Sequence, residues 1–363
     1  MKKLICILLS AVFLLAAACG ETATPVGTPS ASATPAATAE PSPTATAEPQ
    51  PSKAPYIDPL SGVGMDEDIS AKRPWAVMIN NLQQALPQCG VSKADILYEV
   101  PAEGGVTRMM AIFSDISDVE ALGSMRSIRP YYADIALSYD ALVVHAGGSD
   151  AGYSLLKSNG QEHLDGVRGS YQNNPFYRDS ARMQYGVEHS MFTTGEKLLA
   201  TATEEGFHFD HDGAYDYHLS FSDTAADQCT EKAEYVKVSF NGYKTTSFTY
   251  DAATGLYTAY EYGANYVDGN TGDNMTFRNL MVLTTSISVV DSVGRLSVKL
   301  TGEGDGYFIC GGKYVPITWQ RDSSTSAFRY YLSDGSELDL SVGNTYVGIM
   351  SSDSSAKIAF EKN

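Results

Sequence analysis

The sequence predicts a folded body with a layered α/β N-terminal domain and a mainly antiparallel β C-terminal domain, preceded by a disordered N-terminal linker. Three observations predict this architecture. Strand-like and helix-like segments alternate up to about residue 217, the helical pattern then fades, and a Pro-rich stretch precedes both parts. Alternating strands and helices indicate helices layered on a sheet, whereas strands without helices indicate an antiparallel sheet. We therefore divide the body into residues 56–217 and 218–363, because roughly 300 residues is large for one core.

Short apolar runs predict the strands of the N-terminal domain, at residues 73–81, 94–100, 106–115 and 139–148. Between them, residues 130–139 carry apolar side chains at helical spacing. Ser149-Asp150 predicts the capped start of a second helix, and residues 193–206 predict a third helix that Gly206 closes.

Alternating apolar and polar residues predict the strands of the C-terminal domain. The sequence Ala-Thr-Gly at 253–255 predicts a hairpin turn within residues 247–262. Asp334-Gly335, between two alternating runs, is the strongest hairpin signal in the chain.

The first residues predict export and lipid attachment. Lys2 and Lys3 precede an apolar run over residues 4–15, and three alanines then lead directly to Cys19. This pattern predicts a lipoprotein signal peptide over residues 1–18, with a diacylglycerol on Cys19; the alternative is an ordinary secretory peptide. Residues 19–55 are rich in Thr, Ala, Pro and Ser, which predicts a disordered linker between the lipid and the body. We expect the protein at the outer face of a bacterial cytoplasmic membrane.

The formal net charge of −18 argues against a nucleic-acid partner, because binding to phosphate backbones requires clustered Lys and Arg. It also argues against adhesion to anionic lipid through a basic patch, so we expect the lipid on Cys19 to make the membrane contact. Cys229 and Cys310 could form a disulfide in an oxidising compartment, or each could be a buried free thiol.

A group of polar residues follows the apolar runs of the N-terminal domain and is our candidate ligand-binding site. Its members are Glu99, Glu103, Arg108, Arg126, Ser127, Arg129 and His145. Arg126 and Arg129 lie three residues apart beside hydroxyl side chains, and paired guanidiniums suit a phosphate or carboxylate. The alternative is that the arginines are neutralised within the protein by Glu99 and Glu103.

Arg178 and His189 mark a second candidate edge, with Glu188 next to the histidine. The sequence FHFDHD at 207–212 superficially suggests a metal site, but no further group completes a ligand set, and we interpret it as an interdomain loop. We expect no metal and no cofactor.

Several of these segments together resemble the YerB-like bacterial lipoproteins, a family of unknown function. The segments are RPWAVMINN (73–81), EGGVTRMMAIFSD (103–115), GSMRSIRPYYADIALSYDALVVHAGGS (123–149), FYRDSAR (176–182) and GEGDGYFICGGKYVPITWQR (302–321). The resemblance implies an N-terminal α/β domain, a β-rich C-terminal domain and a lipid anchor. It supplies no activity.

Three functions fit these observations. We favour a binding module, not an enzyme, that holds an envelope glycan or a phosphate-bearing anionic polymer through Arg126 and Arg129. The second is a hydrolase or transferase acting on a phosphodiester or glycosidic bond, with Glu99, Glu103 or His145 moving protons. The third is a scaffold for a protein partner.

Overall fold

The computed structural model describes residues 54–169, 171 and 174–361. The predicted signal peptide, Cys19 and the linker up to residue 53 lie outside these residues. The helices are α1 (Pro130–Leu137), α2 (Asp150–Ser158) and α3 (Gly195–Glu204). None of the helices in this part of the chain is long and apolar enough to cross a membrane.

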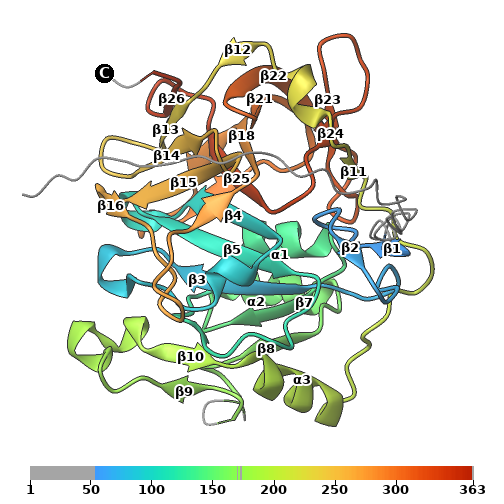
Figure 1. The fold of residues 1–363 in the computed structure, drawn as a ribbon. Helices are drawn as coiled ribbons and strands as arrows, with labels where there is room; N and C mark the ends of the chain where they lie inside the picture. The colour runs from blue at the N-terminus through green and yellow to red at the C-terminus, as the bar shows by residue number, and fades with distance from the viewer. Residues whose placement is uncertain (1–53, 170, 172–173, 362–363) are drawn as a thin grey trace, which may run out of the picture. The chain divides into compact units, whose positions relative to one another are not determined.

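One central sheet dominates the described residues (Figure 1). Its strand order is β12-β22-β21-β18-β25-β4-β5-β3-β7-β8, and β23 pairs with β22. In chain order, its strands are β3 (Trp75–Asn80), β4 (Ile96–Pro101), β5 (Thr107–Phe113), β7 (Leu142–His145), β8 (His163–Asp165), β12 (Glu231–Lys232), β18 (Asn279–Thr285), β21 (Gly302–Cys310), β22 (Lys313–Arg321), β23 (Arg329–Tyr331) and β25 (Thr345–Ser351). The sheet is continuous across both predicted domains, because β25 pairs in parallel with β4.

A second sheet of six strands belongs to the C-terminal half: β13 (Tyr235–Ser239), β14 (Thr245–Asp251), β15 (Leu256–Glu261), β16 (Ala264–Asn265), β17 (Thr276–Phe277) and β26 (Lys357–Ala359). A three-stranded sheet joins β6 (Leu122–Gly123), β10 (Met191–Thr193) and β9 (Tyr177–Arg178). Three two-stranded pairs complete the strands: β1 (Tyr56–Ile57) with β2 (Gly64–Met65), β11 (Ser220–Phe221) with β24 (Asp339–Leu340), and β19 (Ile287–Val289) with β20 (Leu296–Val298).

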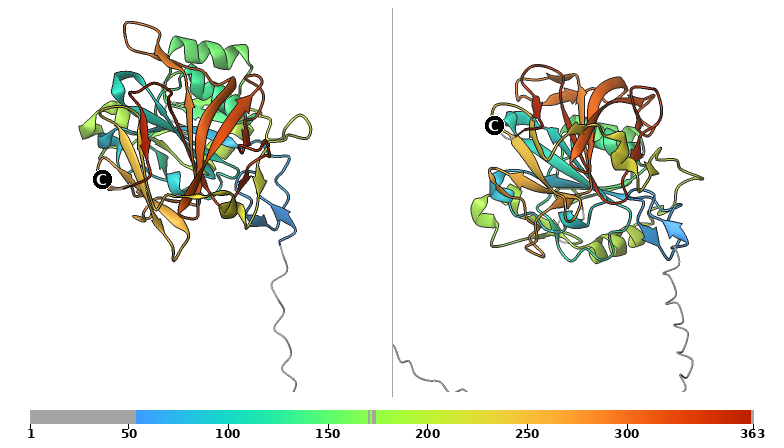
Figure 2. Two further views of the ribbon diagram at one scale, coloured as in Figure 1. Left: turned by 90° about the horizontal axis from the view of Figure 1, so that it is seen from above. Right: turned by 45° about the horizontal axis from the view of Figure 1, so that its top comes forward.

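The central sheet is apolar on both faces, and successive residues of a strand serve different cores. In β3, Val77 and Ile79 belong to one core, whereas Ala76 and Met78 belong to the other. Helices α1 and α2 cover the second core, and the six-stranded sheet and α3 contribute to the first. Figure 2 shows the two green helices together on one side of the sheet and the gold strands on the other. Coverage on both faces explains why these strands read as continuous apolar runs.

The predicted elements are present. Ser149 caps α2 by accepting a hydrogen bond from the N–H of Gly152, and Thr194 caps α3 by accepting one from the N–H of Lys197. The 253–255 turn joins β14 to β15, and a turn at Asp334-Gly335 returns the chain after β23. The fold class is confirmed: a mixed α/β N-terminal half and a β-rich C-terminal half. The exact boundary at residue 217 stays a prediction.

Candidate functional site

Arg108 and Arg129 form an internal ion-pair cluster with Glu103. The Arg108 guanidinium lies 2.8 Å from Glu103 Oε1, and Arg129 donates to both oxygens of the same carboxylate. Both arginines are buried. Burial by itself would raise the pKa of Glu103, but hydrogen bonding from Arg129 and the charge of Arg108 lower it to about 2. These two arginines are therefore paired with one carboxylate within the protein, which corrects the prediction that Arg126 and Arg129 act together on one ligand.

Glu99 lies in a second internal cluster, which joins the two halves of the chain. It is fully buried in β4, and its oxygens accept hydrogen bonds from Thr107, Thr246 and Tyr346, with distances of 2.6, 2.7 and 2.7 Å. Lys244 Nζ lies 3.3 Å from Glu99 and also pairs with Glu261. A carboxylate held by so many partners contributes to structure and is not exposed to a ligand.

His145 is also engaged inside the protein. Its Nδ1 lies 2.8 Å from the carbonyl oxygen of Gly147 and must therefore be the donor, which leaves Nε2 to accept from His163 at 3.1 Å. Burial lowers the pKa of His145 to about 4, although Asp165 opposes the shift. The ring is thus neutral near pH 7.

Arg126 differs from these residues. Its backbone is fixed, because its N–H donates to Met78 and its carbonyl oxygen accepts from Ala146. Its guanidinium is half-buried, yet makes no hydrogen bond or ion pair with any residue that the structure describes. Burial lowers the pKa of Arg126, and the nearby positive charge of Arg108 lowers it further, whereas the charge of Glu188 raises it. A half-buried cation without a partner is the arrangement that an anionic ligand would complete.

Arg126 lines a cavity of about 350 Å³, within the size range of small-ligand sites. We call this cavity the arginine pocket. Its lining residues are Met125, Arg126, Ser127, Ala146, Gly147, Gly148, Val167, Arg168, Arg178, Val187, Glu188 and Met191. Three arginines against one glutamate give the lining a net positive charge, although the whole chain is strongly acidic.

The fold explains why these residues meet. Strands β3, β7 and β8 are parallel neighbours, and the segment around Arg126 bridges to Ile79 near the carboxyl end of β3. Gly147 and Gly148 follow β7, and Arg168 follows β8. The pocket thus lies at the carboxyl ends of parallel strands, where open α/β sheets usually bind ligands.

Arg178 lines the same pocket from β9, so the pocket joins Arg126 and Ser127 of the first predicted group with Arg178 of the second. Its guanidinium donates to the carbonyl oxygen of Val187 and to Ser190 Oγ. Arg168 stacks on Tyr153 at 4.1 Å and lies 3.6 Å from the exposed carboxylate of Asp150, a surface pair of little strength.

Glu188 contributes a carboxylate to the pocket lining, and His189 follows it in the chain. His189 Nδ1 lies 2.9 Å from Asn80 Nδ2, which can only donate, so the proton of His189 is on Nε2, 3.8 Å from Glu188. Burial lowers the pKa of His189, so the ring is neutral near pH 7. His189 itself does not line the pocket.

Arg168 lines the pocket but was not among the predicted site residues. It lies shortly after β8, as Gly147 and Gly148 lie shortly after β7, and this place after a strand is the signal that could have found it. Ser127 lines the pocket as predicted, but its hydroxyl donates to the carbonyl oxygen of Ala146.

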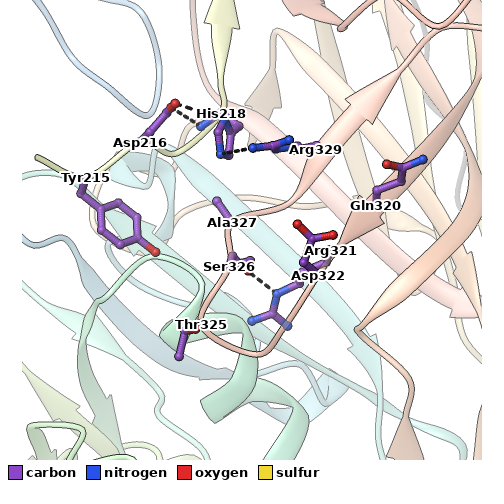
Figure 3. Close-up of a pocket in the computed structure, with 10 residues that line it drawn as sticks. All are labelled: Tyr215, Asp216, His218, Gln320, Arg321, Asp322, Thr325, Ser326, Ala327 and Arg329. Carbon is purple, nitrogen blue, oxygen red and sulfur yellow. Dashed lines mark hydrogen bonds and ion pairs between the residues drawn. The ribbon is translucent and has the colours of Figure 1, made fainter.

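A different cavity, of about 220 Å³, lies between the 215–218 segment and the end of β22 (Figure 3). Its buried cation, Arg321, pairs with Asp134 and donates to several backbone carbonyl oxygens. Arg329 contacts His218, whose other ring nitrogen lies 3.1 Å from Asp216 (Figure 3). Arg321, Arg329 and His218 already have partners within the protein, so the arginine pocket is the stronger candidate.

The remaining predicted features have structural roles. His208 pairs with Glu162 whereas His211 pairs with Asp140, so the two rings of FHFDHD do not converge. Within the described residues, no group of three or more His, Cys, Asp or Glu side chains is placed to hold a metal ion. Cys229 and Cys310 are both buried free thiols.

Comparison with known proteins places this site within a family. Residues 60–208 match the N-terminal domain model of a protein family of unknown function, DUF3048, and residues 236–347 match its C-terminal domain model. The chain belongs to the DUF3048 family. All three arginines of the pocket fall within the N-terminal match, whereas Lys244, Glu261 and Tyr346 of the buried cluster fall within the C-terminal match.

A relative in this family is the putative lipoprotein YerB of Bacillus subtilis. It is 26% identical over 295 residues, which cover 80% of this chain and 85% of the relative. The crystal structure of YerB from Bacillus subtilis matches with a TM-score of 0.72 and covers 84% of this chain and 99% of its own. The YerB-like resemblance read from the sequence is thereby confirmed.

Proposed function

We propose that the chain is a lipoprotein, anchored through Cys19 at the outer face of the cytoplasmic membrane, that binds an anionic envelope ligand in the arginine pocket. The anchor is supported by the signal-like N-terminus and by the name of the relative, a putative lipoprotein. The binding role is supported above all by one observation: the half-buried guanidinium of Arg126 lines a cavity and has no hydrogen-bond or ion-pair partner among the described residues.

Two further features support this proposal. Arg168 and Arg178 line the same cavity from separate elements, so a ligand bound there would lie near more than one cation. Charge-assisted hydrogen bonds from guanidiniums to phosphate or carboxylate are about twice as strong as neutral ones. The pocket also forms at the carboxyl ends of β3, β7 and β8, on rigid strands and their adjoining loops.

The enzymatic alternative has less support. It assigned proton transfer to Glu99, Glu103 or His145, and each of these is engaged with internal partners. None of the three lines the arginine pocket. Glu188 lines the pocket, but no serine, threonine or cysteine hydroxyl or thiol there is paired with a base.

Binding of pyrophosphate to the mature chain, with Cys19→Ser to avoid lipidation, tests the proposal by calorimetry. Arg126→Gln should weaken binding by about ten- to a hundredfold, because it removes a charge-assisted hydrogen bond. Arg295→Gln is the matched control, since Arg295 pairs with Asp291 in the hairpin of β19 and β20 and lies outside the pocket.

The control should bind as the parent does, and binding should weaken with added salt because the contact is ionic. Equal affinity of the parent and Arg126→Gln would overturn the proposal and leave the scaffold alternative.

A further inference from the structure

The arginine pocket is lined by aliphatic and thioether side chains as well as by arginines. Apart from the charged residues, Ser127 and two glycines, the described residues of the lining are Met125, Ala146, Val167, Val187 and Met191. Among these described residues there is no aromatic side chain and no Asn or Gln side chain. The cations therefore lie beside apolar surface within one cavity.

The apolar part of the lining extends to the protein surface. Val167 is 40% exposed and Val187 is 54% exposed, and both line the pocket. Large apolar side chains left exposed beside a cavity mark a binding surface more often than isolated exposed residues do.

This composition distinguishes between a glycan and a phosphate ester. Ring faces of sugars stack on aromatic side chains, and their hydroxyls need paired donors and acceptors such as side-chain amides; the described lining residues offer neither. Guanidiniums suit phosphoryl oxygens, and valine and methionine side chains suit an aliphatic chain. Glu188, a single carboxylate, reduces the net positive charge of the described lining residues.

We infer that the ligand of the arginine pocket is an amphiphilic phosphate ester, with a phosphoryl group at Arg126, Arg168 and Arg178 and an aliphatic chain over Val167 and Val187. The inference rests on the proposed function and specifies its ligand class. A chain tethered to a membrane by lipid works beside a bilayer, where such amphiphiles are concentrated.

The test compares three soluble probes by calorimetry with the mature Cys19→Ser chain: octyl phosphate, methyl phosphate and octyl glucoside. Octyl phosphate should bind at least about tenfold more tightly than methyl phosphate, because burial of even a few methylene groups supplies that factor. Octyl glucoside, which has the chain without the phosphate, should bind far more weakly than octyl phosphate.

Val187→Ser should reduce the preference for octyl over methyl phosphate to about threefold or less, because it removes apolar contact with the chain. Val293→Ser is the matched control, since Val293 is 65% exposed and lies outside the pocket. Val187→Ser keeps the backbone carbonyl oxygen that accepts a hydrogen bond from Arg178.

The outcomes separate the two claims. Equal affinity for octyl and methyl phosphate, both dependent on Arg126, would overturn the amphiphile inference and leave the proposed function intact. Absence of Arg126-dependent binding of every phosphate probe would overturn the proposed function itself.

Two possible sources of the ligand are then distinguished with vesicles. If the chain sediments with phosphatidylcholine vesicles that contain phosphatidylglycerol, and Arg126→Gln abolishes this binding, the ligand is a phosphodiester lipid. Sedimentation only when the vesicles contain dodecyl phosphate would assign a phosphomonoester amphiphile. Sedimentation with neither, despite tight octyl phosphate binding, would overturn a membrane source for the ligand.

Discussion

At the scale of single residues, the structure separates arginines that look equivalent in the sequence. Arg126 and Arg129 are three residues apart, yet Arg129 is buried against Glu103 whereas Arg126 lines a cavity without a partner among the described residues. The difference follows from the backbone. Arg129 directly precedes α1 and points toward Glu103, whereas Arg126 lies beside the ends of β3 and β7.

Glu103→Gln tests the internal role of this carboxylate. The substitution leaves Arg108 and Arg129 buried without their anion, so the free energy of unfolding should fall by about 3 kcal/mol in urea denaturation. Glu120→Gln, at an exposed carboxylate, should change it by less than about 0.5 kcal/mol. A Glu103→Gln chain as stable as the parent would show that the two arginines are not held by this residue.

At the scale of elements, the buried cluster of Glu99, Lys244 and Glu261 connects three strands or their flanks. Glu99 is in β4, Glu261 ends β15, and Lys244 directly precedes β14. Two carboxylates thus share one ammonium in a fully buried site. Burial, followed by the charge of Glu99, raises the pKa of Glu261 to about 7. The buried site therefore favours the protonated form of Glu261 below about pH 7.

This pKa predicts how stability depends on pH. Because the folded-state pKa of Glu261 is raised, its contribution is fully present below its unfolded value near 4.5 and is lost as pH rises through about 7. Between pH 5 and pH 8, the free energy of unfolding of the parent should therefore fall by on the order of 2–3 kcal/mol more than that of the Glu261→Gln variant. Urea unfolding at both values measures this; parallel losses in the parent and the variant would contradict it.

The local elements were predictable because their signals are local. The cap at Ser149, the turn at Asp334-Gly335 and the apolar runs of β3, β4 and β5 depend on neighbours within a few residues. The pairing of β25 with β4 was not predictable in this way, since it joins residues far apart in the chain. Nothing in either strand's sequence specifies its partner.

At the scale of the whole molecule, one sheet passes through both halves of the chain. β4 lies between β5 and β25, so the N-terminal strands border directly on the C-terminal ones (Figure 1). The buried cluster crosses the same border, because Tyr346 and Lys244 from the C-terminal half satisfy Glu99. The two halves therefore complete one another's core and polar network.

A fragment of residues 54–217 should accordingly fail to fold by itself. It would leave β4 with an open edge and Glu99 buried without Lys244, Thr246 and Tyr346. Proton NMR should show poor dispersion for the fragment, whereas the chain from residue 54 to the end should show a dispersed spectrum and one urea transition. A well-dispersed spectrum of the fragment would establish an independent N-terminal domain.

The sequence by itself determined the succession of the main strands and helices along the chain, the fold class, the family resemblance and the set of candidate polar residues. These features depend on apolar periodicity, caps and turns, which are properties of short stretches of chain. Only the tertiary structure decided which of those polar residues are available. Whether an arginine meets a carboxylate depends on which strands become neighbours, and that depends on contacts between distant segments. Arg108 and Arg129 were brought to Glu103, and Arg126, Arg168 and Arg178 were brought to one cavity, by the packing of the sheet and its loops.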